Sequence, residues 1–211
     1  MVAHLGDGSL LKVGDEASEA FVKEIDLRRF SILHFATHAV TDDDNPPRSA
    51  VLLATGGPAE DGLLQMREIV ALHLAGRIVV LSSCRSASGE LLRGEGVMGL
   101  ARAFFQAGAH VVVASLWPLA DDDAADLFDR FYLHLADGDS VAAALAAAQR
   151  DRLAAGAPAY AWAGVVVLGD GDQVPVPGGV PRRGWGTAAA VVAGALAILL
   201  VAAVARLRRR P

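Results

Sequence analysis

Short apolar runs alternate with longer stretches of mixed polarity along this chain. The short runs, flanked by charged or turn residues, predict buried strands. We place these strands at 31–36, 50–54, 77–82, 110–115 and 162–168. The stretches between them carry apolar residues at helical spacing, and we place helices at 14–29, 64–72, 96–107, from 121 onwards and at 140–155. Strands that alternate with helices predict an α/β fold with a mostly parallel sheet covered on both faces.

The composition changes towards the C-terminus. Residues 173–186 are rich in proline and glycine, which predicts a linker. Residues 187–205 contain no charge, and 19 residues of helix just span a hydrocarbon core of roughly 30 Å. We therefore expect a single-pass membrane protein with one transmembrane helix at 187–205 and a basic tail at 206–211. A buried or amphipathic helix is the alternative for this segment.

Two signals bear on the orientation in the membrane. The N-terminus has neither the basic start nor the apolar core of a secretory signal, so we expect the domain at 1–172 to stay cytoplasmic. The arginines of the basic tail argue the other way, because positive charge favours the cytoplasmic side. We give the absent signal more weight, since a whole domain needs a route across the membrane.

Charge excludes one class of partner. The chain of 211 residues has room for one domain with a sizeable core. It carries 24 acidic residues against 19 basic ones, and every acidic residue precedes residue 173. Such a surface repels nucleic-acid phosphates and lacks the basic patch that binding requires, so we expect no nucleic-acid partner.

The candidate chemistry lies just past two of the predicted strands. The strand at 31–36 leads to His38, and the strand at 77–82 leads to Cys84, the only cysteine of the chain. A histidine and a thiol at the ends of neighbouring parallel strands lie side by side, as a general base and a nucleophile do in a Cys-His peptidase. Cys84 follows His38 by 46 residues, close to the spacing of roughly 50 seen in caspases.

These segments belong to an ordered series of motifs. The series comprises Leu33-His34-Phe35-Ala36-Thr37-His38, Leu81-Ser82-Ser83-Cys84, the stretch 94–104, Ala107-Gly108-Ala109, the stretch 113–118, Ala147-Ala148-Gln149, Trp162-Ala163 and Leu168-Gly169-Asp170. Through them the chain resembles the CHAT domain, a caspase-like peptidase module often found beside tetratricopeptide repeats. The resemblance spans roughly residues 14 to 170, with the motifs in the family's order.

The resemblance implies a caspase-like three-layer α/β sandwich with a Cys-His dyad. His38 would be the general base and Cys84 the nucleophile, and the backbone N–H groups of Ala39 and Cys84 would form the oxyanion hole. Ser115, Leu116 and Trp117 would line the edge where a protein or peptide substrate adds as a strand. Such a peptidase needs no metal or cofactor, and it is commonly held inactive until it is cleaved or bound by a regulatory protein.

Three departures from the family pattern matter. Ala39 stands where the family usually has glycine, and Arg85 stands where an acidic residue often follows the cysteine. The family's first strand and helix would also lie upstream of Met1, so the domain at 1–172 is expected to be N-terminally incomplete. A missing strand would leave one edge of the sheet unpaired, and such edges tend to pair with other chains.

Other interpretations remain open. The principal alternative function is an inactive CHAT-fold module that docks a protein partner at the membrane. A metal site from His34, His38 and Cys84 is conceivable, although a packed core histidine is the more typical role for His34. The acidic run at 42–44 predicts a solvated loop, with a basic-substrate pocket or a cation site as the alternatives. Glu90 and Glu95 are further candidates for a specificity pocket.

Overall fold

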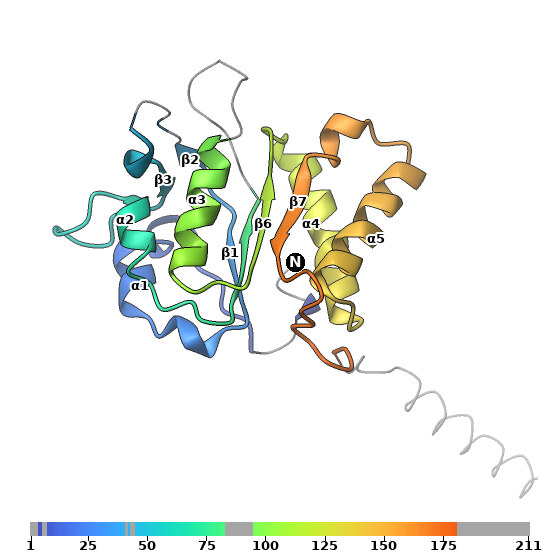
Figure 1. Ribbon diagram of the computed structural model, residues 1–211, viewed down its shortest axis with the longest axis horizontal. Coiled ribbons are helices and arrows are strands. Elements are labelled where there is room, and N and C mark those ends of the chain that lie inside the picture. The colour runs from blue at the N-terminus through green and yellow to red at the C-terminus, as the bar shows by residue number, and fades with distance from the viewer. Residues whose placement is uncertain (1–3, 6–7, 41, 43–44, 83–94, 181–211) are drawn as a thin grey trace, which may run out of the picture. The chain divides into compact units, whose positions relative to one another are not determined.

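A central four-stranded sheet organises the computed structural model, which describes residues 4–5, 8–40, 42, 45–82 and 95–180 (Figure 1). Its strands are β1 (Ile32–Phe35), β5 (Ile78–Leu81), β6 (Val111–Ser115) and β7 (Val165–Gly169), in the order β1-β5-β6-β7. The first three are parallel, and β7 runs antiparallel to β6. The predicted α/β fold with a mostly parallel sheet is confirmed.

The two inner strands are apolar throughout because helices cover both of their faces. Every residue of β5 and β6 is buried, and successive side chains enter opposite layers. Val79 and Leu81 pack in the layer of α3 (Glu95–Gln106), whereas Ile78 and Val80 pack in the layer of α4 (Asp121–Ala136) and α5 (Val141–Ala154). Helices therefore flank the sheet on two sides, which gives three layers (Figure 1).

A second, three-stranded antiparallel sheet follows β1 directly. It consists of β2 (Ala39–Val40), β3 (Ala50–Leu52) and β4 (Leu63–Gln65), in that order. β4 runs straight into the short helix α2 (Met66–Ile69), whose first turn is closed by a capping box between Gln65 and Glu68. The sequence predicted only β3, and it assigned residues 64–72 to one helix.

The helix predicted at 14–29 is shorter than expected. Its regular part is α1 (Glu19–Glu24), with single 3₁₀ turns at Gly14–Glu16 and Leu27–Arg29 on either side. Ser18 starts α1 by accepting a hydrogen bond from the Phe21 N–H, and the extended backbone of Ile25 ends it. Another 3₁₀ turn, Ala159–Ala161, precedes β7, and one at Pro46–Arg48 precedes β3.

A buried arginine of α5 forms ion pairs with two aspartates of α4. The guanidinium of Arg152, which is only 8% exposed, donates to Asp126 at 2.7 Å and to Asp123 at 2.6 Å. The acidic run that opens α4 was predicted to complement the helix dipole. Asp123 additionally pairs with a buried cation from the neighbouring helix.

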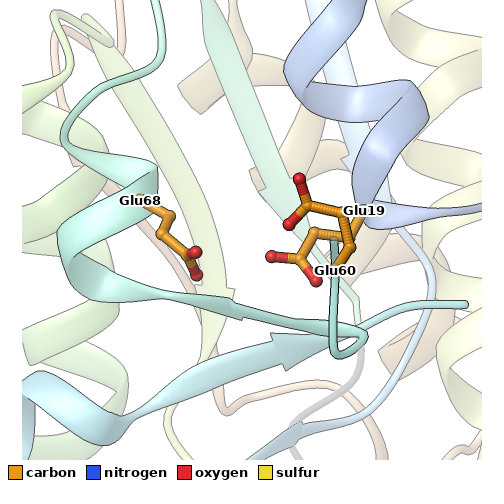
Figure 2. A group of neighbouring side chains, drawn as sticks. All are labelled: Glu19, Glu60 and Glu68. Atoms are coloured by element: carbon orange, nitrogen blue, oxygen red, sulfur yellow. The ribbon is translucent and has the colours of Figure 1, made fainter. Parts of the chain in front are cut away.

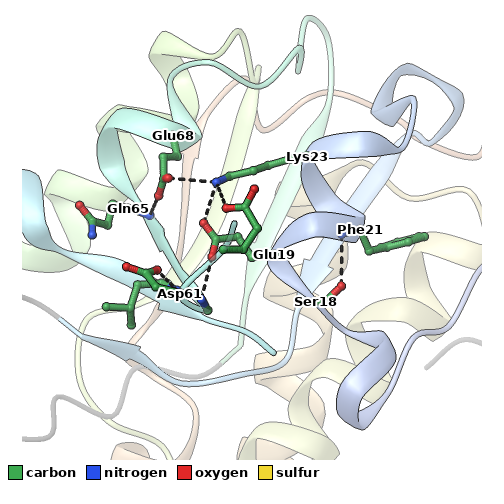
Figure 3. A network of polar contacts seen from close by, with 10 residues as sticks. Ser18, Glu19, Phe21, Lys23, Asp61, Gln65 and Glu68 are labelled. Atoms are coloured by element: carbon green, nitrogen blue, oxygen red, sulfur yellow. Dashed lines mark hydrogen bonds and ion pairs between the residues drawn. The ribbon is translucent and has the colours of Figure 1, made fainter. Parts of the chain in front are cut away.

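One lysine joins three separate segments around α1. The Lys23 ammonium forms ion pairs with Glu19 at 2.7 Å, with Glu68 at 2.9 Å and with Glu60 (Figure 3). Glu19 is 1% exposed, and its Oε2 also accepts a hydrogen bond from the Gly62 N–H at 2.8 Å. Burial of Lys23 acts against its charged form, but hydrogen bonds to the three glutamates prevail and raise its pKa. The cluster thus ties α1 to the β3–β4 loop and to α2.

The expectation of a membrane-spanning helix is wrong. Among the described residues, no helix combines the length and the apolar character needed to cross a bilayer. The segment predicted to span, 187–205, lies outside the described residues. The fold class loses its transmembrane element, and the single-pass membrane localisation with a cytoplasmic domain loses its support.

The first half of the predicted linker contacts the domain. The Gln173 carbonyl accepts from the Val141 N–H at 3.0 Å, and the Gln173 side chain donates to the Gly76 carbonyl at 3.0 Å. The Val180 N–H donates to the Ala136 carbonyl at 2.6 Å. Residues 173–180 are therefore attached to α4, α5 and the turn before β5, while the domain boundary at residue 172 stays a prediction.

We expect Lys23→Met to lower the free energy of unfolding by roughly 2–4 kcal/mol, because it leaves the buried Glu19 carboxylate without its cation. Lys12→Met is the matched control, since Lys12 pairs with Glu16, a residue that is 69% exposed, and such pairs contribute less than about 1 kcal/mol. Urea unfolding followed by circular dichroism measures both. Equal losses in the two variants would contradict the structural role of the Lys23 cluster.

Candidate active site

The carboxyl ends of β1 and β5 meet at one edge of the main sheet. The two strands are paired in parallel, with Phe35 opposite Leu81, and the Ser82 N–H donates to the Phe35 carbonyl at 3.3 Å. His38 and Cys84 each follow their member of this pair by three positions. Cys84 itself lies outside the described residues, so the dyad stays a prediction that this register favours.

His38 lies in the segment that connects β1 of the main sheet to β2 of the small sheet, and it is exposed. Its carbonyl accepts a hydrogen bond from the Leu52 N–H at 2.8 Å, and the hydroxyl of the preceding Thr37 donates to the Leu52 carbonyl at 2.6 Å. The main chain around His38 is therefore held by β3.

Ala39 meets one geometric requirement of an oxyanion donor. It pairs with Val51 across the β2–β3 ladder, next to the bonded pair of His38 and Leu52. Because bonded and non-bonded pairs alternate in an antiparallel ladder, the Ala39 N–H faces away from β3. β2 is the outer strand of its sheet, so no described strand covers that side. The predicted role of this N–H stays untested, as does that of the Cys84 N–H.

The predicted substrate edge follows β6. Ser115 is fully buried, and its hydroxyl donates to the Trp117 carbonyl at 2.6 Å. The Leu116 N–H donates to the Gly164 carbonyl at 2.8 Å, although the Leu116 side chain is 42% exposed. The Leu116 N–H is therefore already bonded to the segment before β7, and the Trp117 carbonyl already has one donor. The substrate role of these three residues stays a prediction.

Gly164 leaves the space that the Trp117 indole occupies. The indole N–H donates to the Tyr160 carbonyl at 2.8 Å, and the ring lies directly on Gly164. A Cβ atom added to Gly164 would come within 2.4 Å of the ring. The position of the indole beside Leu116 thus depends on the absence of a side chain at residue 164.

His34 faces away from the candidate dyad, into the α4 layer. Its Nδ1 lies 3.0 Å from the Tyr132 hydroxyl, and its ring stacks on Tyr132 with centroids 5.5 Å apart. Phe128 lies beside the same ring at 5.5 Å. Among the described residues, the buried Nε2 atom has no hydrogen-bond partner. These contacts are those of a packed core histidine, the interpretation that the sequence favoured over a metal ligand.

Burial lowers the pKa of His34 from 6.5 to about 4. The folded chain therefore takes up a proton at this site less readily than the unfolded chain, and stability is lost as the pH falls from 6.5 towards 4. We expect the loss from this one group to approach about 3 kcal/mol at the acid end of the window. Urea unfolding of wild type and His34→Gln across this range measures it.

The acid-dependent loss should shrink in His34→Gln and persist in His73→Gln, which changes an exposed histidine remote from this core. Parallel pH profiles for wild type and His34→Gln would contradict a neutral buried imidazole.

Three carboxylates converge at a second place, away from the strand ends. Glu19, Glu60 and Glu68 point towards one another, with an oxygen of each lying within 4.8 Å of the others (Figure 2). Carboxylate oxygens are ligands for Ca²⁺ or Mg²⁺. The Lys23 ammonium, however, pairs with all three and already supplies the cation. The geometry is that of a structural ion-pair cluster.

The other candidates contribute little to the described site. Asp42 forms a loop with Asn45, whose N–H donates to its carboxylate at 2.8 Å, in keeping with the solvated-loop interpretation. Glu95 begins α3. Residues 43–44, Arg85 and Glu90 lie outside the described residues.

Comparison with known proteins agrees with this geometry. The family model of the CHAT domain matches residues 1–170. This chain belongs to the CHAT domain family. The family is caspase-like, and the resemblance inferred from the motifs is confirmed.

Two curated relatives are similar to part of this chain. Tetratricopeptide repeat protein 28 of mouse and that of human are each 30% identical to this chain over 122 residues. The match covers 57% of this chain and only 5% of either relative. The matched part of this chain therefore corresponds to a small part of those proteins.

Sequence reasoning missed the contacts that hold the site. Thr37 was part of a recognised CHAT motif, but its partner Leu52 is distant in the sequence, and nothing in the motif identifies it. β2 and β4 contain two and three residues, too few for an alternating pattern to stand out. The one available signal was the polar Thr37 immediately after an apolar strand.

Proposed function

We propose that this CHAT domain is a cysteine endopeptidase that hydrolyses peptide bonds of protein substrates, with Cys84 as nucleophile and His38 as general base. The observation that carries the proposal is the parallel β1–β5 register, in which Phe35 is opposite Leu81. Both reactive residues follow that pair at equal distance along the chain. The caspase-like family and the exposed position of His38 add support.

The proposed reaction begins when the His38 imidazole takes the proton of the Cys84 thiol. The thiolate attacks the peptide carbonyl carbon, and the resulting oxyanion is bound by the N–H groups of Ala39 and Cys84. The protonated imidazole then gives its proton to the leaving amine as the C–N bond breaks. Water hydrolyses the remaining thioester and restores the thiol.

The substrate would bind as an added strand beside the end of β6. Because the Leu116 N–H already bonds to Gly164, we assign the pairing to the main chain of Ser115 and Trp117. The exposed Leu116 side chain and the indole of Trp117 would contact substrate side chains. Similarity to tetratricopeptide repeat proteins supports a role among protein partners, and we propose a protein regulator of the peptidase as well.

A second candidate function is that of a non-catalytic docking module with the same fold. The observation in its favour is the outer edge of β1, which pairs with no strand other than β5 among the described residues. An exposed strand edge binds extended segments of other proteins through main-chain hydrogen bonds. The two candidates differ in whether Cys84 is an activated thiol.

Alkylation of Cys84 by iodoacetamide, measured against pH on the full chain, distinguishes the two functions. In the peptidase we expect a thiolate that forms well below the free-thiol pKa of about 8.5, and His38→Ala should return it towards that value. His110→Ala is the control, because His110 lies at the opposite end of β6 and should leave the profile unchanged.

If wild type and His38→Ala titrate alike near the free-thiol pKa, the peptidase proposal fails and the docking module is left. A shifted profile in His110→Ala would likewise contradict an assignment to His38. Because Cys84 is the only cysteine, the alkylation signal needs no correction for other thiols.

A further inference from the structure

Leu52 is bonded to the two residues at the end of the His38 motif through both of its main-chain groups. Its N–H donates to the His38 carbonyl at 2.8 Å, and its carbonyl accepts from the Thr37 hydroxyl at 2.6 Å. One peptide group on each side of Leu52 therefore holds consecutive residues of the chain between β1 and β2.

The second of these bonds comes from a side chain and lies at the end of the β2–β3 ladder. The β2–β3 register pairs Ala39 with Val51, so His38 is opposite Leu52. In a regular bonded pair of an antiparallel ladder, the two residues exchange both N–H···O=C bonds. At this end of the β2–β3 pairing, the Leu52 carbonyl accepts a hydrogen bond from the Thr37 hydroxyl.

The Thr37 bond lies in the segment that joins the two sheets. β1 ends at Phe35, and β2 begins at Ala39, so residues 36–38 pass from one sheet to the other. The side chain of Thr37 attaches the backbone just before His38 to β3, beside the main-chain bond that the His38 carbonyl accepts.

The segment that follows Leu52 is itself held by hydrogen bonds. The next residue, Leu53, donates its N–H to the Gly62 carbonyl at 2.8 Å, and the Gly62 N–H donates to the buried Glu19 carboxylate at 2.8 Å. Glu19 is in turn paired with Lys23 (Figure 3). The acceptor of the Thr37 hydroxyl is thus part of a fixed segment, which is what a positioning contact requires.

We propose that Thr37 is a positioning residue of the proposed dyad, whose hydroxyl fixes the main chain that carries the His38 imidazole and the Ala39 N–H. The inference rests on the proposed peptidase function and adds a residue to it. Thr37 does not touch the substrate or the reacting atoms; it acts on them through the main chain that it bonds to β3.

The test compares Thr37→Val, which keeps the shape and loses the hydroxyl, with Thr37→Ser, which keeps the hydroxyl. The readout is the pH profile of Cys84 alkylation by iodoacetamide in the full chain. In Thr37→Val we expect the thiol pKa to rise by about one unit, which lowers alkylation about tenfold at pH values below it. Thr37→Ser should retain the wild-type profile, because its hydroxyl can still reach the Leu52 carbonyl.

Thr55→Val is the matched control. Thr55 is exposed, and among the described residues its hydroxyl makes no hydrogen bond, so its loss should leave both the profile and the melting temperature unchanged. Should Thr37→Val fail to fold, Thr37→Ala removes the same donor without the added methyl group and is measured in its place.

His38→Ala, measured beside these variants, separates the positioning role of Thr37 from the peptidase function on which it rests. A wild-type profile in Thr37→Val or Thr37→Ala, alongside a shifted one in His38→Ala, would overturn the positioning role alone. Identical profiles for wild type and His38→Ala would overturn the peptidase function beneath it. An altered profile in Thr37→Ser would contradict the hydroxyl as the responsible group.

Discussion

The parallel pairing of β1 with β5 is the constraint on which the rest of the site depends. Parallel strands place like ends at the same edge of the sheet, and Phe35 lies opposite Leu81 at that edge. Every residue of β5 is buried, with Val80 and Leu81 in opposite apolar layers, so helices on both faces hold this strand. The burial of ordinary aliphatic side chains therefore sets where the chain leaves the sheet ahead of the candidate residues.

A second constraint concerns only the segment that contains His38. Residues 36–38 join the main sheet to the small one, and each end of this segment is tied to a different sheet. The small sheet would be a weak support by itself, because its strands contain only two or three residues. The buried Glu19 carboxylate strengthens it by bonding the loop between β3 and β4. The ion-pair cluster around Lys23 thus supports the β3–β4 loop, and through it the small sheet to which the His38 segment is bonded.

Most of the large elements could be predicted from the sequence, because their own residues determine them. The continuous apolar runs of β5 and β6, and the sequence patterns of α3 and α5, placed these elements within one residue, and the acidic run at 121–123 placed the start of α4. The helix at 14–29 was overextended because Ser18 caps it late and Ile25 ends it early. At the site, the motif identified His38 as the candidate base. The Thr37–Leu52 bond could not be foreseen, since it joins residues from two different sheets.

Gly164 has a consequence for how related chains are compared. Its missing side chain is a steric condition for the Trp117 indole, because any larger residue would occupy the volume of the ring. A homologous chain with alanine or a larger residue at this position can share the fold and the tryptophan, yet it must turn the indole elsewhere. An alignment column at residue 164 therefore reports on the shape of the surface beside Leu116, which a match at Trp117 alone does not.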